Sequence, residues 1–328
     1  MKTVLYFIIC LLICFVSSEA VGQRKKKKFK GNKGTSKREM RKRQEEANER
    51  NPNTNAFNPL QSMGARQNDA RDDLLWHSES ANTVYDKAGN ISLTSPSRYG
   101  LKPGLELSSV LPLNYWVPNL FIKKRWLNTK WYISTRHGLY SGTPGFIWAQ
   151  KKGYETIADT SWSVPFILTA RNEIMLSRLI SKNNTCSRAQ PYVIITLGLG
   201  ADYGVAFGDN DLEEIDEHFL ANRSAPLTGN GLLTYAKLRA DWQINGYLVL
   251  GGAFRYYYAD FTGQHAFEQQ TDLQTFILPA FSVSIGYNLS YANYNLSNRV
   301  AIIPSFDLTW HFGRRQGRDK GLFKSKMF

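Results

Sequence analysis

The chain has 328 residues, of which 42% are hydrophobic and 13% aromatic, and its formal net charge is +14. The excess charge lies near the two ends: residues 23–50 hold 13 Lys and Arg against four Glu, and residues 313–328 hold six against one Asp, whereas residues 51–312 hold 21 of each sign. This distribution excludes a uniformly basic folded surface, and after residue 22 no apolar run approaches the ~18 residues of a membrane-spanning helix.

The chain begins with a predicted export signal, residues 1–22. Lys2 is followed by an apolar run over 4–16 and then by small residues at Ala20-Val21-Gly22, which is the order found in cleaved signal peptides. The two cysteines of the apolar run leave with it, so Cys186 is the only cysteine of the mature chain. The sequence therefore predicts export without an internal disulfide.

Residues 23–68 form a predicted disordered, basic periplasmic arm, and residues 314–328 form a second disordered basic tail. Both are poor in apolar residues and rich in like charge, so they cannot bury enough surface to fold. Anionic phospholipid, a cell-wall polymer or an acidic protein is the predicted partner. Nucleic acid is not, since an exported chain rarely meets it. A solvated tether without a partner is the alternative. The predicted anion-binding residues are Lys25, Lys26, Lys27, Lys28, Arg314 and Arg315.

Residues 69–96 form a predicted segment that precedes the folded domain. Its most apolar stretch, Leu74-Leu75-Trp76, follows two aspartates and is followed by His77. We expect this stretch to be either a short helix or a segment packed at the mouth of the domain that follows.

Residues 97–313 are predicted to form one β-strand after another. In 192–203, Val193, Leu197 and Leu199 alternate with small or polar residues such as Thr196 and Gly198. Successive side chains of a strand point to opposite sides, so each strand has one apolar face and one polar face. The ten predicted strands are residues 99–108, 119–126, 130–140, 161–171, 173–180, 191–203, 232–244, 247–261, 273–287 and 300–312.

This pattern behind an export signal predicts an all-β fold: an antiparallel transmembrane β-barrel of about 10 strands (roughly 8–12) in the outer membrane of a Gram-negative bacterium. An even strand number places both basic tails in the periplasm. With ten strands, the long connection 208–231 also faces the periplasm, and Asn245-Gly246, predicted as a two-residue hairpin turn, faces outward. Long loops usually face outward, so either the strand count is wrong or this barrel breaks that asymmetry.

Several segments resemble a family of outer-membrane β-barrel proteins of the Bacteroidota for which no activity is established. The resemblance covers 97–313 and implies the barrel and the membrane, but no catalytic residue. The segments that carry it are Tyr99-Gly-Leu, 117–126 (VPNLFIKKRW), 135–140 (TRHGLY), Thr143-Pro-Gly145 and Arg171-Asn-Glu173.

Residues with chemical potential are few. The five histidines have no metal-ligand spacing, and no nucleotide-binding glycine motif occurs, so no metal and no cofactor is predicted. Ser134, His137 and Glu173 are candidates for a hydrolase triad, although Ser134 and His137 fall on opposite strand faces. The alternative is a charge network inside a narrow lumen. The predicted lumenal or ligand-contacting residues are Arg136, Arg171, Lys237, Arg239, Asp241 and Asp307.

The predicted function is therefore non-enzymatic: a structural or interaction component, or a narrow porin-like channel, of the bacterial envelope. An outer-membrane lipid acyl hydrolase is one alternative. A soluble secreted β-barrel or sandwich that binds a ligand is the other. The sequence predicts neither the ligand nor the oligomeric state.

Overall fold

The computed structural model describes residues 54–55, 58–62, 74–154, 158–181, 191–212, 224–259, 265–293 and 298–313. The chain forms two units, residues 1–63 and 64–328. In the first unit, β1 (Thr54–Asn55) pairs antiparallel with β2 (Asn58–Ser62). The predicted disordered arm thus includes one short hairpin. The rest of that arm, the predicted export signal and the C-terminal tail lie outside the described residues.

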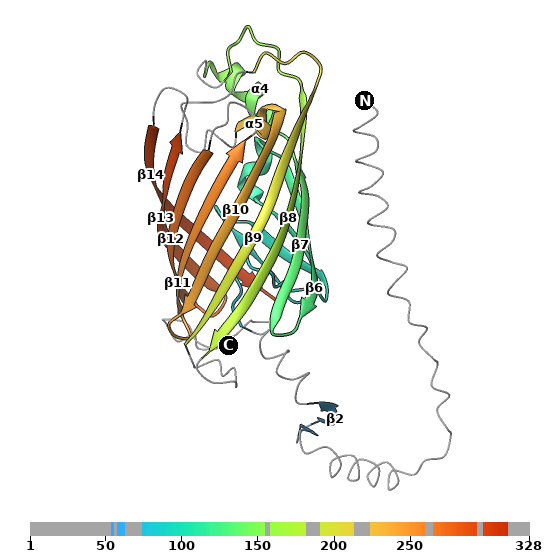
Figure 1. Cartoon of the computed structure of the whole chain (residues 1–328), viewed down its shortest axis with the longest axis vertical. Helices are drawn as coiled ribbons and strands as arrows, with labels where there is room; N and C mark the ends of the chain where they lie inside the picture. Colours follow the sequence, from blue (N-terminus) through green and yellow to red (C-terminus); the bar gives the residue numbers. More distant parts are fainter. Residues whose placement is uncertain are drawn as a thin grey trace, which may run out of the picture. The chain divides into compact units, whose positions relative to one another are not determined.

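The second unit contains a closed antiparallel β-barrel of 12 strands, β3 to β14, in which each strand pairs with its neighbours in the sequence and β14 closes the barrel on β3 (Figure 1). The strands are β3 (Gly89–Ser92), β4 (Ser97–Lys102), β5 (Leu105–Ser109), β6 (Asn119–Asn128), β7 (Trp131–Tyr140), β8 (Phe166–Ser181), β9 (Tyr192–Phe207), β10 (Asn230–Gln243), β11 (Leu248–Ala259), β12 (His265–Leu278), β13 (Phe281–Asn293) and β14 (Asn298–Phe312). The all-β closed barrel is as predicted.

The strand count is 12 and not about ten, because three differences from the prediction each add a strand and a fourth removes one. The first strand, β3, is absent from the prediction and lies in the predicted pre-barrel segment 69–96. The ranges 99–108 and 273–287, each predicted as one strand, are each two strands with a turn between them. Conversely, residues 166–171 and 173–180, predicted as parts of two strands, belong to the single strand β8.

The turn inside 273–287 has a recognisable cause at Pro279-Ala280. Proline has no N–H to donate to a neighbouring strand, so a proline inside a predicted central strand argues against that strand. β12 ends just before Pro279, and β13 begins just after Ala280. The side of each connection is assigned by counting strands back from the C-terminus, so this missed turn reverses the side of the connections between β8 and β12. For the connections before β8, the joining of two predicted strands into β8 cancels the change.

With 12 strands the two longest connections lie at the same end, which also holds the short links 93–96, 260–264 and 294–297. The short-turn end holds the links 103–104, 129–130, 244–247 and 279–280, together with the longer link 182–191 and the end of β14. The opposite, helical end holds the longest links, 141–165 and 208–229, which contain α4 (Thr143–Lys152) and α5 (Ser224–Thr228), and the link with the 3-10 helix η1 (Leu111–Tyr115). Figure 1 shows α4 and α5 at the same end of the barrel. The conflict over the connection 208–231 therefore disappears.

The turn at Asn245-Gly246 differs from the predicted two-residue hairpin. Neither residue has a positive φ. Instead, the Asn245 side chain accepts hydrogen bonds from the backbone N–H groups of Tyr247 (3.0 Å) and Leu248 (2.9 Å). The asparagine side chain thus takes over the role that left-handed backbone plays in a two-residue turn.

The distribution of polar and apolar side chains is the reverse of that in a soluble protein. Large apolar side chains on the outer face are highly exposed, for example Ile302 at 66% and Leu199 at 62%. Charged side chains on the inner face are buried, for example Lys123 and Arg239 at 0% and Glu106 at 1%. Four tryptophans, Trp126, Trp131, Trp242 and Trp310, are exposed near the short-turn end. In the residues that the structure describes, no helix is long and apolar enough to cross a membrane.

Candidate functional site

Residues 74–88, which we call the lumenal segment, run inside the barrel before β3 begins. Their backbone or side chains contact inward-facing residues of seven strands: Arg98, Glu106, Lys123, Tyr132, Ser177, Tyr192 and Arg255. The apolar anchor is Trp76, whose ring lies 4.5 Å from that of Tyr132. The predicted segment at the barrel mouth is therefore an irregular stretch within the lumen, and it obstructs part of it.

Lys123 of β6 holds the lumenal segment most directly. Its Nζ donates hydrogen bonds to the carbonyl oxygens of Ser78 (3.0 Å), Ser80 (3.2 Å) and Asn82 (3.1 Å), and it pairs with Glu106 Oε1 at 3.1 Å. An ammonium group has three donors and no acceptor, so these three carbonyls use its full capacity. A buried Lys without such partners is strongly disfavoured.

Glu106 of β5 links three partners on the same side of the lumen. It receives two hydrogen bonds from Arg98, at 2.9 and 2.7 Å, and one from the backbone N–H of Val84 at 2.9 Å. Arg98 also donates to the carbonyl oxygen of Trp76 at 3.0 Å. Every charge at this point is paired and hydrogen-bonded, which is the condition for burying ions in a protein interior.

Glu79 holds the lumenal segment to the opposite wall. It pairs with Arg255 of β11 at 2.8 Å and lies 3.9 Å from Arg239 of β10. Burial alone raises the pKa of Glu79, but Arg255, Lys237 and Arg239 outweigh it and hold that pKa well below its ordinary value of 4.5. Burial lowers the pKa of His77 well below 6.5, and Arg239 lowers it further. His77 is thus neutral and Glu79 ionised at neutral pH.

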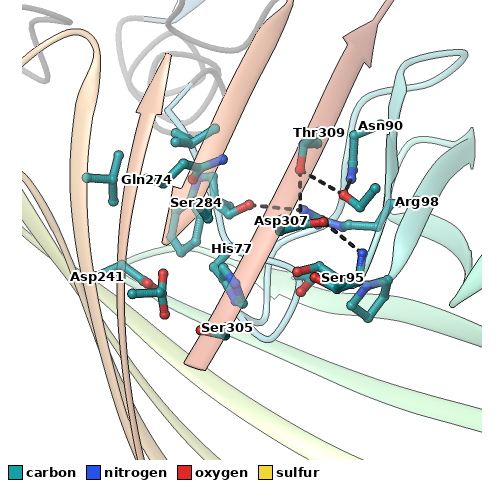
Figure 2. Close-up of a pocket in the computed structure, with 18 of the residues that line it drawn as sticks. His77, Asn90, Ser95, Arg98, Asp241, Gln274, Ser284, Ser305, Asp307 and Thr309 are labelled. Carbon is teal, nitrogen blue, oxygen red and sulfur yellow. Dashed lines mark hydrogen bonds between the residues drawn. The ribbon is translucent and has the colours of Figure 1, made fainter. Parts of the chain in front are cut away.

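The lumenal segment fills the lumen unevenly and leaves a cavity of about 350 Å³ against β10–β14, β3 and β4. In Figure 2, Asp241 and Gln274 lie on one side of this lumenal cavity and Asn90 and Arg98 on the other, with His77 between them. The inward-facing residues of β12 and β13 at this cavity are only half-buried, whereas those of β6 to β9 are mostly buried. The cavity is therefore the unfilled part of the lumen.

Three successive rows of register partners across β10 to β14 build the wall of the cavity. The middle row alternates acids with glycines and ends on a serine. The rows are Arg239, Ala253, Gln270, Asn288 and Ile303; Asp241, Gly251, Asp272, Gly286 and Ser305; and Gln243, Val249, Gln274, Ser284 and Asp307. Because Gly251 has no side chain, the Arg239 guanidinium crosses it to reach Asp272 at 3.1 Å; a Cβ there would lie 2.5 Å from Arg239 Nη2.

The structure places the predicted lumenal residues on the inner wall in separate groups. Arg239 pairs with Asp241 (2.8 Å) and Asp307 accepts from the backbone N–H groups of Leu93 and Thr94, all at the cavity. Arg136 and Lys237 both pair with Glu173 away from the cavity.

Arg171 forms a third group toward the helical end. It is bidentate to Asp202, which also accepts a hydrogen bond from Tyr140 at 2.9 Å. Its guanidinium lies within 5.5 Å of the Phe121 ring centre. Arg171, Asp202 and Tyr140 do not line the cavity. The sequence therefore gives a correct polar inner face without showing which residues meet.

The three hydrolase candidates are not brought together. Ser134 faces inward and is fully buried, and its Oγ has no hydrogen-bond partner among the described residues. His137 belongs to the alternate, outer set of β7, where its Nδ1 lies 2.7 Å from Asn172 Oδ1. Glu173 is held by Arg136 and Lys237. This arrangement provides no base for the Ser134 hydroxyl.

Sequence reasoning missed most of the cavity. Asp272 and Gln274 lie in a range whose strand boundaries were mispredicted, and His77 belongs to a segment predicted to lie at the mouth. A signal was present in the glycines: an isolated Gly within a strand often marks a place where other atoms approach closely. Within the described part of the chain, no group of three or more His, Cys, Asp or Glu residues is placed to hold a metal ion.

Comparison with known proteins gives little. No protein-family model matches the sequence, and no curated protein matches it. Among solved structures, the chain is similar to an outer membrane channel from Pseudomonas putida F1, with 10% sequence identity and a TM-score of 0.30; the match covers 72% of this chain and 98% of that one.

Proposed function

We propose that the protein is an outer-membrane β-barrel, exported through a cleaved signal peptide, whose polar lumen is a narrow passage for small solutes that the lumenal segment obstructs. The observation that carries this proposal is the opposed polarity of the two faces. An outer face with Leu199 and Ile302 more than 60% exposed is stable only against an apolar medium, while the buried ionic groups need a polar lumen.

The lengths of the connections support the same orientation. Outer-membrane barrels have short periplasmic turns and longer outer loops, and here the short turns share one end with the C-terminal end of β14. The helical end is then the outer surface. The resemblance of 97–313 to a Bacteroidota barrel family agrees with this proposal, as does a periplasmic position for the two basic tails near anionic lipid head groups.

Two measurements test the location. A spanning barrel stays in the membrane pellet after carbonate extraction, and its folded form migrates differently on a gel before and after boiling. Release into the supernatant, together with identical migration, would favour the soluble β-protein instead.

A disulfide lock tests the obstruction. The Ala81 backbone N lies 2.8 Å from Ser177 Oγ, so cysteines at these two positions are close enough to be bridged. In a Cys186→Ser background, Ala81→Cys with Ser177→Cys should hold the lumenal segment in place. We expect low conductance in planar bilayers when oxidised and higher conductance after reduction. The single variant Ala81→Cys is the control. If the barrel conducts in neither the oxidised nor the reduced state, the proposed passage is rejected and a structural role of the barrel remains.

The lipid hydrolase alternative has weaker support, because Ser134 and His137 lie on opposite faces of β7. Ser134→Ala should leave any phospholipase activity of the purified barrel unchanged. A loss of activity on this substitution would revive the hydrolase.

A further inference from the structure

The middle row of the cavity wall offers more hydrogen-bonding atoms than the protein satisfies. Asp241 is only 4% exposed; its Oδ1 receives Arg239, but its Oδ2 has no partner among the described residues. Asn288 Oδ1, one row away, is also buried without a partner there. Leaving a buried acceptor unpaired is unfavourable, so such atoms in a cavity indicate a partner from outside the chain.

Donors without a hydrogen bond also line the same cavity, although Arg239 Nη1 lies 3.9 Å from the Glu79 carboxylate. Arg239 Nη1 makes no hydrogen bond among the described residues, and the Ser78 hydroxyl, on the lumenal segment opposite, makes none either. A ligand that only donates would leave Arg239 unsatisfied, and one that only accepts would leave Asp241 unsatisfied. A hydroxyl group does both.

The charges around the cavity disfavour an ionic ligand of either sign. A cation placed at Asp241 meets Arg239, and an anion placed at Arg239 meets Asp241 and Asp272. The carboxylates do not converge on one point, as a metal ion would require. Like-charge contact at close range costs several kcal/mol, whereas a neutral polyol avoids it.

The shape of the cavity fits the same class of ligand. Gln270, Asp272, Gln274 and Ser305 line this side of the cavity, and Gln274 and Ser305 are labelled in Figure 2. Gly286, the register partner of Ser305, adds no side chain to this wall, because a Cβ there would lie 2.1 Å from the backbone oxygen of Thr271. A volume of about 350 Å³ lies in the range of small-molecule sites.

We propose that the lumenal cavity binds a neutral, polyhydroxylated solute of the size of a mono- or disaccharide, with Asp241, Asn288 and Arg239 as its principal contacts. The ligand donates hydroxyl protons to Asp241 Oδ2 and Asn288 Oδ1 and accepts one from Arg239 Nη1. This proposal names the solute class of the passage proposed above and, as a route for solute, rests on it. Binding itself does not depend on conduction.

Calorimetry on the full-length, folded barrel in detergent tests the proposal. The neutral probes are glucose, galactose and maltose; putrescine, succinate and serine, which are cationic, anionic and zwitterionic, are the comparisons. We expect saturable millimolar or tighter binding of at least one neutral probe and at least tenfold weaker binding of each charged probe. Charged or zwitterionic probes binding as well as the sugars, or no probe saturating below about 50 mM, would overturn the proposal.

Two variants locate the site. Asp241→Asn should weaken sugar binding by about tenfold or more, the usual scale for a hydrogen bond to a charged group. Ser305→Phe fills the cavity without removing a charge and should abolish binding even if Asp241→Asn folds poorly. Asp209→Asn, an exposed acid beyond β9, is the matched control and should bind as the parent does.

Sugar binding unchanged by both Asp241→Asn and Ser305→Phe would place the ligand elsewhere and reject the site. A barrel that conducts but binds no sugar would keep the proposed passage and refute this ligand class. A barrel that binds sugar but never conducts would keep the site and refute the passage.

Discussion

At the scale of single residues, ionic groups of the barrel wall hold one irregular segment inside the lumen. Lys123 and Glu106 fasten one side of residues 74–88, and Glu79 fastens the other. Ion pairs of this kind add little when compared with a well-packed apolar core, but removing one partner leaves a buried charge or carbonyl unpaired. The positions of these pairs therefore decide where the segment can sit.

Lys123→Met should loosen the lumenal segment. The substitution leaves the carbonyls of Ser78, Ser80 and Asn82 without this donor, so we expect the unfolding free energy to fall by at least about 2 kcal/mol. Urea titration of the folded barrel, followed by tryptophan fluorescence, measures the loss. Bilayer conductance should also rise.

The neighbouring residue supplies the control for this variant. Lys124 faces outward, with its Nζ 3.8 Å from the centre of the Trp126 ring. Lys124→Met removes the same charge and should change the unfolding free energy by less than about 1 kcal/mol. Equal effects of the two substitutions would contradict the role given to Lys123.

Acidification should also release the lumenal segment. Folded His77 resists protonation, so its contribution to the unfolding free energy is complete above pH 6.5 and declines as the pH falls below that value. Glu79 stays ionised in the folded protein, so its contribution to the unfolding free energy is complete above pH 4.5 and is lost as the pH falls toward its lowered pKa. The unfolding free energy should therefore decrease in two stages on acidification.

His77→Gln should remove the first stage only, and His265→Gln, at the helical end of β12, should remove neither. Unfolding curves from pH 7.5 down to about pH 2.5 follow both stages, since the second begins below pH 4.5. A stability that is flat over this range, or rises on acidification, would show that these two groups do not hold the segment.

At the scale of the strand, the alternation of side chains separates outward-facing residues from lumen-facing residues. In β9, the exposed residues Leu197, Leu199 and Tyr203 alternate with the buried residues Thr196 and Asp202, as the sequence pattern predicts. Register pairing then turns this alternation into transverse rows across neighbouring strands.

A charge on the outer face should cost more at mid-strand than at the strand end. Leu199→Arg places a cation near the middle of the apolar belt, with an expected loss of about 2–4 kcal/mol, while Phe207→Arg at the end of β9 should cost about 0–1 kcal/mol. Unfolding titrations in lipid vesicles measure the difference. A soluble barrel would tolerate both substitutions equally, and that result would contradict the membrane location.

At the scale of the whole molecule, the barrel has one end with short turns and one end with long links and two helices. On the helical side, Phe146, Ala149, Ile167 and Leu212 pack together, so part of this end is a compact cover. The lumenal segment occupies the lumen below. The molecule is thus a barrel that its own chain narrows from within.

Epitope insertion should reveal the orientation. A tag placed after Thr160, in the exposed link that follows α4, should bind antibody on intact cells. A tag after Gly246, where an added side chain meets nothing within 4 Å, should bind antibody only after the outer membrane is permeabilised. The reverse pattern would show that the barrel has the opposite orientation. Labelling of both tags on intact cells would show that the turn at Gly246 does not face the periplasm.

The sequence by itself determined the alternation of apolar and polar residues, and with it the closed barrel and its two opposed faces, because side-chain direction in a strand repeats every two residues regardless of context. It placed Arg239, Asp241 and Asp307 on the inner face for the same reason.

Only the tertiary structure decided the strand number, the orientation and the cavity. One turn at Pro279-Ala280 changes the side of the links between β8 and β12, and local periodicity does not reveal where a long alternating run folds back. The pairing of Asp241, Gly251 and Asp272 depends on register between strands, and the path of Trp76 and Glu79 through the lumen depends on contacts far apart in the sequence. Such long-range contacts leave no periodic signal in the chain.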